Sequence, residues 1–431
     1  MLGALQNLLK KNRVTRSIAQ RTRSFFSPLH HLQDLRDAWN REFYEGDDIA
    51  RCFSLFEKNR DYQAKLASIH VPRAAASTRY LDAEWVSNIG TLANLDGYAK
   101  IGLLGWRPPQ QAFLTAYPGA IGNAFFLGLW KNYFSVLDDP AVLRQRAKQI
   151  PLLLDHNLVM ELRNKLYIFP HAAAVVQREW ENQKRQPLLQ LDEQTKQLGW
   201  DRLAEAGIPH GSWFVAVHVR ENGFKTEEHR RCVRNANIAT YLPAMRKITA
   251  HGGWVIRCGH PTMSPLPKMD RVLDYAYSPI RCDWLDIFLA SQCRFLIGTQ
   301  SGLSHVGDVF GVPTLYTNWI SWGFPPYYNT NVFVPKMLWS REECRTLTLR
   351  EIVPSQLGWC QNPDVFAARG IDILNNTPED LEAAVVQMLN ETETAWDHAR
   401  KQAPLQQAFA EWDVLLNSRV SDAFLSKLQS R

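Results

Sequence analysis

The sequence predicts an α/β protein with a parallel sheet, and two observations lead to this class. Between residues 213 and 319, short apolar runs alternate with amphipathic segments of helical length, as in a parallel sheet with crossover helices. One unit, Arg294 to Asn318, has a turn rich in Gly, Ser and Thr between an apolar run and a short helical stretch. Such a unit places a helix N-terminus at the carboxyl edge of the sheet, where anions bind. An ordinary crossover has the same pattern, so this stretch alone favours phosphate binding only slightly.

The composition is that of a globular protein with a basic arm at its start. The 431 residues are 45% hydrophobic and 21% charged, and no apolar run reaches the ~18 residues of a membrane span. Lys and Arg number 49 against 43 Asp and Glu, and six of the basic residues precede the first acidic one, Asp34. These six account for the whole excess, which argues against nucleic acid as a partner. The seven Cys include no Cys-x-x-Cys, which favours a reducing, cytoplasmic location and argues against zinc.

The N-terminal region is expected to lie outside the α/β part. Residues 1–27 combine leucines with the basic cluster, which predicts either an amphipathic helix on the anionic inner face of a membrane or a solvated terminus. From Asp34 to Ala67, apolar residues recur at helical spacing with a break at Glu45-Gly46-Asp47. We therefore expect residues 1–78 to form a basic arm and a helical appendage.

Residues 79–200 are expected to form a first α/β domain. The runs 99–105 and 112–114 are predicted strands. Two turns, each followed by a helical pattern, could present backbone N–H groups to a ligand, although each could equally be a plain helix start. The residues singled out in these turns are Asn88, Gly90, Gly122 and Asn123.

The second domain, residues 201–360, shows the clearest alternation of strands and helices. Its expected strands are 213–220, 254–257, 273–275, 295–297, 314–316 and 332–334. Its expected helices are 238–248, a helix capped by Asp283, and 303–310, which Gly311 ends. Thr377-Pro378 is a strong helix start within residues 361–431, which we expect to be helical and to pack back on the first domain.

Cationic side chains are expected at the carboxyl edge of the second sheet. His218 and Arg220 end one apolar strand and share a face by alternation, while Arg257 ends the next strand and Arg234 precedes a helix. A buried strand that ends in Arg requires an anion or a carboxylate, and Arg grips phosphate bidentately. The alternative is an internal Arg–carboxylate pair. Three Arg beside the turn 299–302 favour a pyrophosphate site.

Several common nucleotide motifs are absent from the sequence. It has no Asp-x-Asp to hold a divalent metal, no Walker loop, no Gly-x-Gly-x-x-Gly and no Gly-x-Ser-x-Gly. Stabilisation of a leaving group by Arg and a helix dipole, without a metal, suits transfer from a sugar nucleotide.

The run from about Phe214 to Leu338 closely resembles a family of bacterial glycosyltransferases associated with surface polysaccharide loci. The matching pieces are HVRENG (218–223), RNANIATYLPA (234–244), GGWVIRCG (252–259), DWLDIFLASQCRFLIGTQSGLSHVGDVFGVPTLYTNW (283–319) and VPKMLW (334–339). The His-x-Arg is also similar to that of the fucosyltransferase group, whose Arg holds the donor diphosphate. The turn from Gly119 to Asn123 is similar to a first-domain turn of those enzymes.

The resemblance implies a GT-B-like architecture of two Rossmann-like domains, with the acceptor on the first and the donor nucleotide on the second. The implied donor-binding residues are His218, Arg220, Arg234, Arg257, Thr299, Gln300, Ser301, Gly302 and His305. Arg220 is also a catalytic candidate because it would neutralise the leaving diphosphate. An inverting transfer needs a base, for which Asp96 and Glu221 are the candidates.

The sequence thus favours a cytoplasmic, metal-independent glycosyltransferase that moves a sugar from a nucleotide-sugar donor to a glycan, lipid-linked or protein acceptor. A sugar-nucleotide epimerase can share the same fold, and a non-catalytic nucleotide- or glycan-binding protein is a third interpretation. A transferase releases nucleotide only when an acceptor is present, whereas an epimerase interconverts the donor itself.

Overall fold

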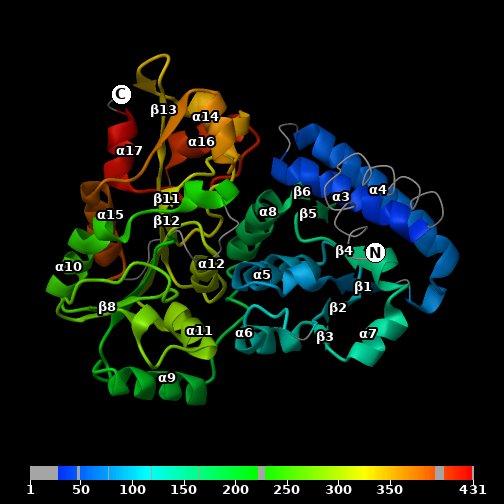
Figure 1. Ribbon diagram of the computed structural model, residues 1–431, viewed down its shortest axis with the longest axis horizontal. Coiled ribbons are helices and arrows are strands. Elements are labelled where there is room, and N and C mark those ends of the chain that lie inside the picture. The colour runs from blue at the N-terminus through cyan, green and yellow to red at the C-terminus, as the bar shows by residue number, and fades with distance from the viewer. Residues whose placement is uncertain are drawn as a thin grey trace, which may run out of the picture. The chain divides into compact units, whose positions relative to one another are not determined.

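The computed structural model describes residues 28–45, 49–75, 77–117, 119–163, 165–221, 229–393 and 402–429. They divide into two compact units (Figure 1). The smaller unit comprises the described residues up to Asp82, with Pro109–Tyr117 and Phe134–His156. The larger unit comprises Ala83–Pro108, Pro118–Tyr133 and the described residues from Asn157 onward. The arm of residues 1–27 lies outside the described residues, and the domain boundaries at 78, 200 and 360 stay a prediction.

The smaller unit joins a helical pair to a parallel sheet. Helices α3 (Pro28–Glu45) and α4 (Ile49–His70) pack together, with the rings of Trp39 and Phe56 edge to face at 5.2 Å. This confirms the predicted helical pair. The four parallel strands have the order β3-β2-β1-β4. The elements are β1 (Thr78–Leu81), β2 (Gln111–Thr115), β3 (Ser135–Leu137), β4 (Leu154–Asp155) and helix α7 (Pro140–Arg146).

The larger unit is built on a seven-stranded parallel sheet of order β16-β12-β11-β10-β7-β8-β9. Apolar runs bounded by Gly and polar residues form these strands, as expected for strands that are buried on both faces. The strands are β7 (Phe214–His218), β8 (Trp254–Arg257), β9 (Val272–Leu273), β10 (Phe295–Gly298), β11 (Thr314–Trp319), β12 (Asn331–Pro335) and β16 (Arg419–Val420).

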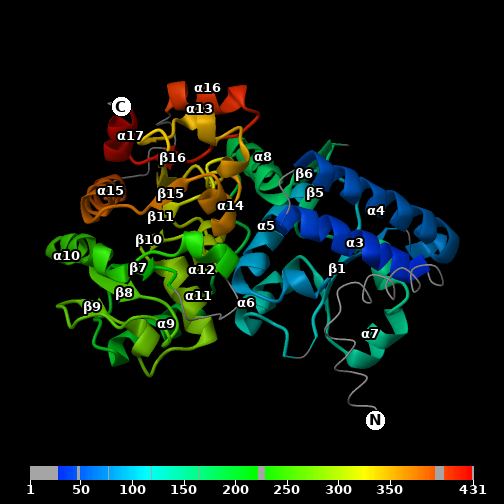
Figure 2. The ribbon, with the colours of Figure 1, turned by 45° about the horizontal axis from the view of Figure 1, so that its top comes forward.

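Helices cover both faces of this sheet (Figures 1 and 2). On one face lie α10 (Leu242–Ala250) and α15 (Pro378–Glu391). On the other lie α9 (Glu193–Glu205), α11 (Asp283–Gln292) and α12 (Gly302–Val309).

Side chains of β7 alternate between these two layers. Val215 and Val217 belong to the core that includes α10 and α15, whereas the ring of Phe214 meets Trp200 of α9 at 5.7 Å. His218 lies four residues after Phe214 on the same strand, so the two side chains point to the same face of the sheet, the face covered by the layer that contains α12.

The remaining elements of the larger unit flank the sheet. A two-stranded sheet pairs β5 with β6, and a three-stranded antiparallel sheet has the order β14-β13-β15. The helices are α5 (Ile89–Leu103), α6 (Ala124–Leu129), α8 (Phe169–Asn182), α13 (Leu349–Ile352), α14 (Pro363–Ala368), α16 (Ala403–Glu411) and α17 (Asp422–Gln429). The strands are β5 (Val159–Leu162), β6 (Lys165–Ile168), β13 (Met337–Ser340), β14 (Arg345–Thr346) and β15 (Ile371–Leu374).

The predicted α/β class with parallel sheets is confirmed, and two local predictions are wrong. The run 99–105, expected as a strand, continues α5 through Leu103, and Ala99 and Ile101 are buried where α5 packs against other elements, among them α8 and α12. Asp283 does not cap α11: the N-cap residue is Cys282, and Asp283 is the first helical residue. The helix start at Thr377 is confirmed, since Thr377 and Asp380 form a reciprocal capping box.

Glycines allow the N-termini of α5 and α12 to meet. A Cβ on Gly302 would lie 2.6 Å from the backbone nitrogen and 2.9 Å from the Cα of Gly90. A Cβ on Gly122 would likewise collide with the backbone of Asn88. The turn at 88–90 is therefore packed against Gly122 on one side and against Gly302 of α12 on the other. Glycine is needed at positions 122 and 302 because a side chain there would collide with backbone atoms.

We expect Gly302→Ala to destabilise the protein. The added methyl group would meet backbone atoms that cannot move aside cheaply, at a cost of about 1–3 kcal/mol. Gly128→Ala in α6 is a matched control, because a Cβ there meets nothing within 4 Å and alanine favours helix. Denaturant unfolding measures both variants. Equal stability of the two would show that the α5–α12 contact is looser than described.

Candidate functional site

His218 at the end of β7 is hydrogen-bonded to Ser301 at the start of α12. Its Nε2 lies 3.0 Å from the Ser301 hydroxyl, and its Nδ1 lies 3.3 Å from the Cys258 carbonyl. Burial lowers the pKa of His218 to about 4, and the neighbouring Arg257 and Arg220 act in the same direction. The ring is therefore neutral at pH 7. Because a carbonyl only accepts, Nδ1 carries the proton, and Nε2 accepts the hydrogen bond from Ser301.

This bond determines how α12 begins. Ser301 is the N-cap residue with φ −145° and ψ 155°, yet its side chain makes no cap hydrogen bond. By contrast, Asn88 caps α5 by accepting from the N–H groups of Gly90 and Thr91. The Ser301 hydroxyl donates to His218 and makes no cap hydrogen bond to the first N–H groups of α12. A helix start of this kind, with the positive end of the helix dipole, suits an anion.

Arg220 is tied to the same turn. Its backbone N–H donates to the Thr299 hydroxyl at 2.9 Å, and its Nε donates to Asn235 Oδ1 at 3.0 Å. Gln300 donates from Nε2 to the Ser321 hydroxyl at 3.1 Å. Thr299 and Gln300 are buried. The predicted turn residues therefore hold the backbone in place and connect it to Arg220 and to the segment after β11.

Lys336 is a second cation in this region, and sequence reasoning missed it. Its side chain is 2% exposed, and Nζ donates to the carbonyls of Val233 at 2.6 Å and Asn235 at 2.8 Å. Burial lowers the pKa of this ammonium to about 8. Arg220 and Lys336 thus both donate to Asn235, one to its side chain and the other to its carbonyl. The available signal was a lysine within the apolar run VPKMLW (334–339).

Arg257 and Glu221 form an internal ion pair. Arg257 is 0% exposed, and its guanidinium bonds Glu221 and Asp274, each at 3.1 Å, and the Ser264 carbonyl at 3.0 Å. Glu221 Oε2 also accepts from the Ser264 N–H at 3.1 Å. The internal Arg–carboxylate pair, the alternative that the sequence left open, is therefore what the structure shows here. The predicted donor-binding role of Arg257 and the predicted role of Glu221 as a base stay predictions.

Asp96 also lies in an internal network. It is 2% exposed, and its Oδ2 accepts from Lys100 Nζ at 2.5 Å and from the Tyr328 hydroxyl at 2.7 Å. Lys100 further donates to Gln177 at 2.7 Å. A buried and paired carboxylate is a poor base for an incoming hydroxyl, so this arrangement argues against the predicted role of Asp96.

His305 stands one turn into α12, four residues after Ser301. Its Nδ1 lies 2.9 Å from the Tyr316 hydroxyl and 3.4 Å from Asp308 Oδ2, while Tyr316 donates to the same Oδ2 at 2.6 Å. The ring stacks on Tyr327 with a centroid distance of 6.2 Å. The His305 side chain is 20% exposed and that of Asp308 is 2% exposed.

The other predicted residues have structural roles. Asn123 caps α6 and donates from Nδ2 to the Asp283 carbonyl at 2.8 Å. Arg234 is half-buried in the turn that precedes Asn235. The structure therefore brings Gly90 to Gly302, Gly122 to Asn88, and His218 to Ser301 at the start of α12.

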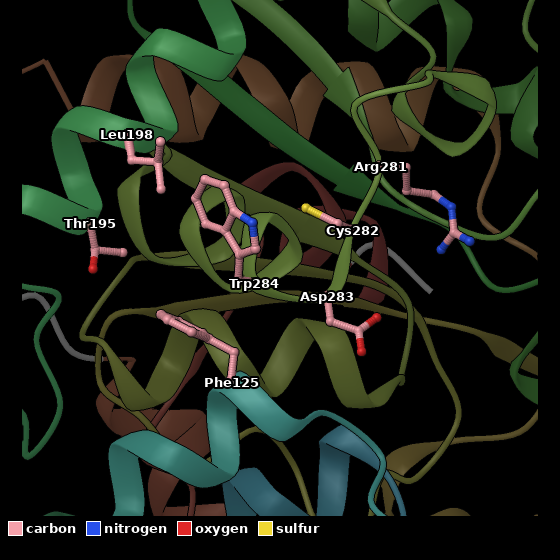
Figure 3. A pocket seen from close by; sticks show the side chains of 7 residues that line it. All are labelled: Phe125, Thr195, Leu198, Arg281, Cys282, Asp283 and Trp284. Atoms are coloured by element: carbon pink, nitrogen blue, oxygen red, sulfur yellow. The ribbon is translucent and has the colours of Figure 1, made fainter.

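A separate open pocket lies between α6, α9 and α11 (Figure 3). Its volume is about 700 Å³, and its lining includes Phe125, Leu198 and Trp284 with Arg281 and Asp283. None of the predicted site residues lines it. Within the described ranges, no group of three or more His, Cys, Asp or Glu could hold a metal ion. No described helix is long and apolar enough to cross a membrane.

Comparison with known proteins finds distant similarity to glycosyltransferases. No family model matches the chain, and no curated protein does. E. coli ADP-heptose lipopolysaccharide heptosyltransferase II has a TM-score of 0.44 and 12% identity, covering 74% of this chain and 100% of that chain. A glycosyl transferase family 9 protein from Veillonella parvula has a TM-score of 0.40 and 11% identity, covering 60% and 86%. The iron-containing dodecameric glycosyltransferase TibC from enterotoxigenic E. coli has a TM-score of 0.36 and 12% identity, covering 74% and 76%. Similarities of this size carry no argument about what this chain does.

The buried, neutral His218 predicts loss of stability in acid. Above about pH 6.5 the ring is neutral in both the folded and the unfolded state, so it contributes nothing to pH dependence. Between pH 6.5 and 4 the unfolded state binds a proton that the folded state does not. Because the pKa is lowered from 6.5 to about 4, this proton costs the folded state up to about 3 kcal/mol.

Unfolding free energies measured between pH 7 and 4.5 check this expectation. The parent should lose about 2–3 kcal/mol more than His218→Gln over this range. His251→Gln, at an exposed position, should keep the parent's dependence. An identical pH dependence in the parent and in His218→Gln would mean that His218 has the same pKa in the folded and unfolded states, so that burial does not keep it neutral in acid.

Proposed function

We propose that this protein is a metal-independent glycosyltransferase of GT-B type. It would transfer a sugar with inversion from a nucleotide-sugar donor to a glycan, lipid-linked or protein acceptor. The observation that carries the proposal is the start of α12, where the Ser301 side chain makes no cap hydrogen bond and the preceding Thr299 accepts from the backbone N–H of Arg220. This is the environment that a diphosphate leaving group requires.

The chemistry follows from charge development in the transition state. As the bond between the anomeric carbon and the diphosphate oxygen breaks, negative charge accumulates on the diphosphate. Fixed N–H dipoles and a guanidinium stabilise that charge without needing to reorganise. The neutral His218 supports this arrangement, because it holds the Ser301 hydroxyl away from the N–H groups that it would otherwise cap. The ammonium group of Lys336, which donates to the Asn235 carbonyl, adds a second positive charge near Arg220.

The packing of α5 on α12 supports the same assignment. The N-terminus of α5 meets that of α12 through Gly90 and Gly302, so the positive ends of two helix dipoles lie together. Of the predicted acceptor-side residues, Asn88 is exposed on this turn. An acceptor bound along α5 would thus reach a donor bound at α12. We also propose that residues 1–27 attach the protein to an anionic cytoplasmic membrane surface, where a lipid-linked acceptor would be met.

Arg220→Ala should lower turnover by at least ~10²-fold, because it removes the side chain that neutralises the leaving diphosphate. Arg220→Lys should restore activity only in part, since a point charge cannot reproduce the bidentate fork. Arg341→Ala is the matched control, because this arginine is 55% exposed and pairs with Asp372 on the antiparallel sheet. The readout is acceptor-dependent release of nucleoside diphosphate from a panel of UDP-, GDP- and ADP-sugars.

Two outcomes would contradict the proposal. A folded Arg220→Ala protein with the parent's turnover would remove Arg220 from the site. Interconversion of the donor sugar without an acceptor would identify an epimerase instead.

A further inference from the structure

We propose that His305 is the general base of this transfer, with Asp308 and Tyr316 as the residues that position it. The inference rests on the proposed glycosyltransferase function and names the group that receives the acceptor's proton. It starts from the finding that Asp96 and Glu221 are both engaged in internal ion pairs.

The hydrogen bonds around His305 determine which ring nitrogen carries the lone pair. The Tyr316 hydroxyl donates its proton to Asp308 Oδ2 at 2.6 Å, so its oxygen accepts from the imidazole at 2.9 Å. Nδ1 is therefore the protonated nitrogen of the neutral ring. The lone pair lies on Nε2, at the outer end of a side chain that is 20% exposed. This is the tautomer that a base requires.

Asp308 places a buried carboxylate against the ring of His305. Its side chain is 2% exposed, and within the described part of the chain the ring of His305 is its one ion-pair partner inside 4 Å. Its second oxygen, Oδ1, is buried without a hydrogen-bond partner. A buried carboxylate in this state is costly, and a positive charge on the adjacent imidazole offsets that cost.

The other ionisable groups packed around the ring do not supply a competing charge. Lys100 and Asp96 of α5 neutralise each other at 2.5 Å. Burial raises the pKa of Tyr316, Tyr327 and Tyr328, so these phenols stay neutral. The groups that face His305 and its partners are Asp308 of α12, Tyr316 of β11, Tyr327 and Tyr328 of the segment before β12, and Asp96 and Lys100 of α5.

The position of His305 on α12 matches the proposed donor site. Residues four apart lie on the same face of a helix, so His305 lies one turn below Ser301. Gly302 and His305 are the residues of α12 that are not buried. The accessible side of this helix therefore carries the anion-binding N–H groups at its start and the imidazole one turn, about 5–6 Å, further along.

The step balances without a further reactant. The acceptor hydroxyl gives its proton to Nε2 of His305 while its oxygen forms a bond to the anomeric carbon. The bond between that carbon and the diphosphate oxygen breaks, and its electron pair leaves with the nucleoside diphosphate. The imidazolium, stabilised by Asp308, then returns the proton to water.

The first test is His305→Gln, assayed with a donor and acceptor pair that the parent turns over. We expect kcat to fall by ~10²–10⁴-fold, the range of general base catalysis, and the acidic limb of the kcat–pH profile to disappear. Nucleoside diphosphate affinity, measured by calorimetry, should change by less than about threefold, because the base makes its contribution in the chemical step. His251→Gln, at an exposed position, is the control and should behave as the parent.

Asp308→Asn provides an independent readout. It keeps the shape of the side chain but removes the charge behind the ring, so the acidic limb should move to lower pH while kcat falls. A purely structural role for Asp308 would leave the position of that limb unchanged. Tyr316→Phe should lower kcat and leave nucleotide affinity intact.

The outcomes separate the two proposals. If the parent neither binds nucleoside diphosphates nor transfers sugar, the proposed function fails, and this inference fails with it. If the parent transfers sugar and His305→Gln keeps both its kcat and its acidic limb, His305 is not the base and the proposed function stands. If His305→Gln does not fold, an unmoved acidic limb in Asp308→Asn overturns the inference.

Discussion

The hydrogen bond between His218 and Ser301 is the interaction on which the rest of the site depends. A serine at the start of a helix ordinarily accepts from the N–H groups of its own first turn. Here the Ser301 hydroxyl donates to a buried imidazole that burial keeps neutral. The stabilisation that a cap would give, typically ~1 kcal/mol, is forgone, and the start of α12 is left for another acceptor. A protein that only needed to hold its fold together would gain from the cap.

The close approach of α5 and α12 imposes the second constraint. Gly90 and Gly302 lie so near each other that neither tolerates a side chain, which fixes the distance between the two helix N-termini. Two buried ion pairs stabilise the scaffold: Arg257 pairs with Glu221, and Lys100 pairs with Asp96. Arg220 and Lys336 both donate hydrogen bonds to Asn235.

Much of the parallel sheet could be predicted from sequence because its strands are apolar runs bounded by Gly and polar residues. The helices after Ile238 and Thr377 and the turn before α12 were predicted for the same kind of local reason. The run 99–105 was wrongly predicted as a strand. A mostly apolar helix lacks the alternation of apolar and polar residues at helical spacing that would distinguish it from a buried strand. At the candidate site, the ends of strands drew attention to His218, Arg220 and Arg257, but sequence alone could not say that Arg257 meets internal carboxylates. The ion pairs of Arg257 with Glu221 and Asp274, and the hydrogen bond between Asp308 and Tyr316, join residues that are separated in sequence. These contacts form only when the elements pack together, so the sequence does not reveal them.

We propose that the start of α12 binds the diphosphate of a nucleotide sugar, and a crystal structure with a bound nucleoside diphosphate would show whether it does. We expect phosphate oxygens within hydrogen-bonding distance of the N–H groups of Gly302 and Leu303 and of the Arg220 guanidinium. The His218–Ser301 hydrogen bond should be unchanged. A diphosphate bound elsewhere, such as the pocket that Trp284 lines, with water at the start of α12, would rule out this donor site.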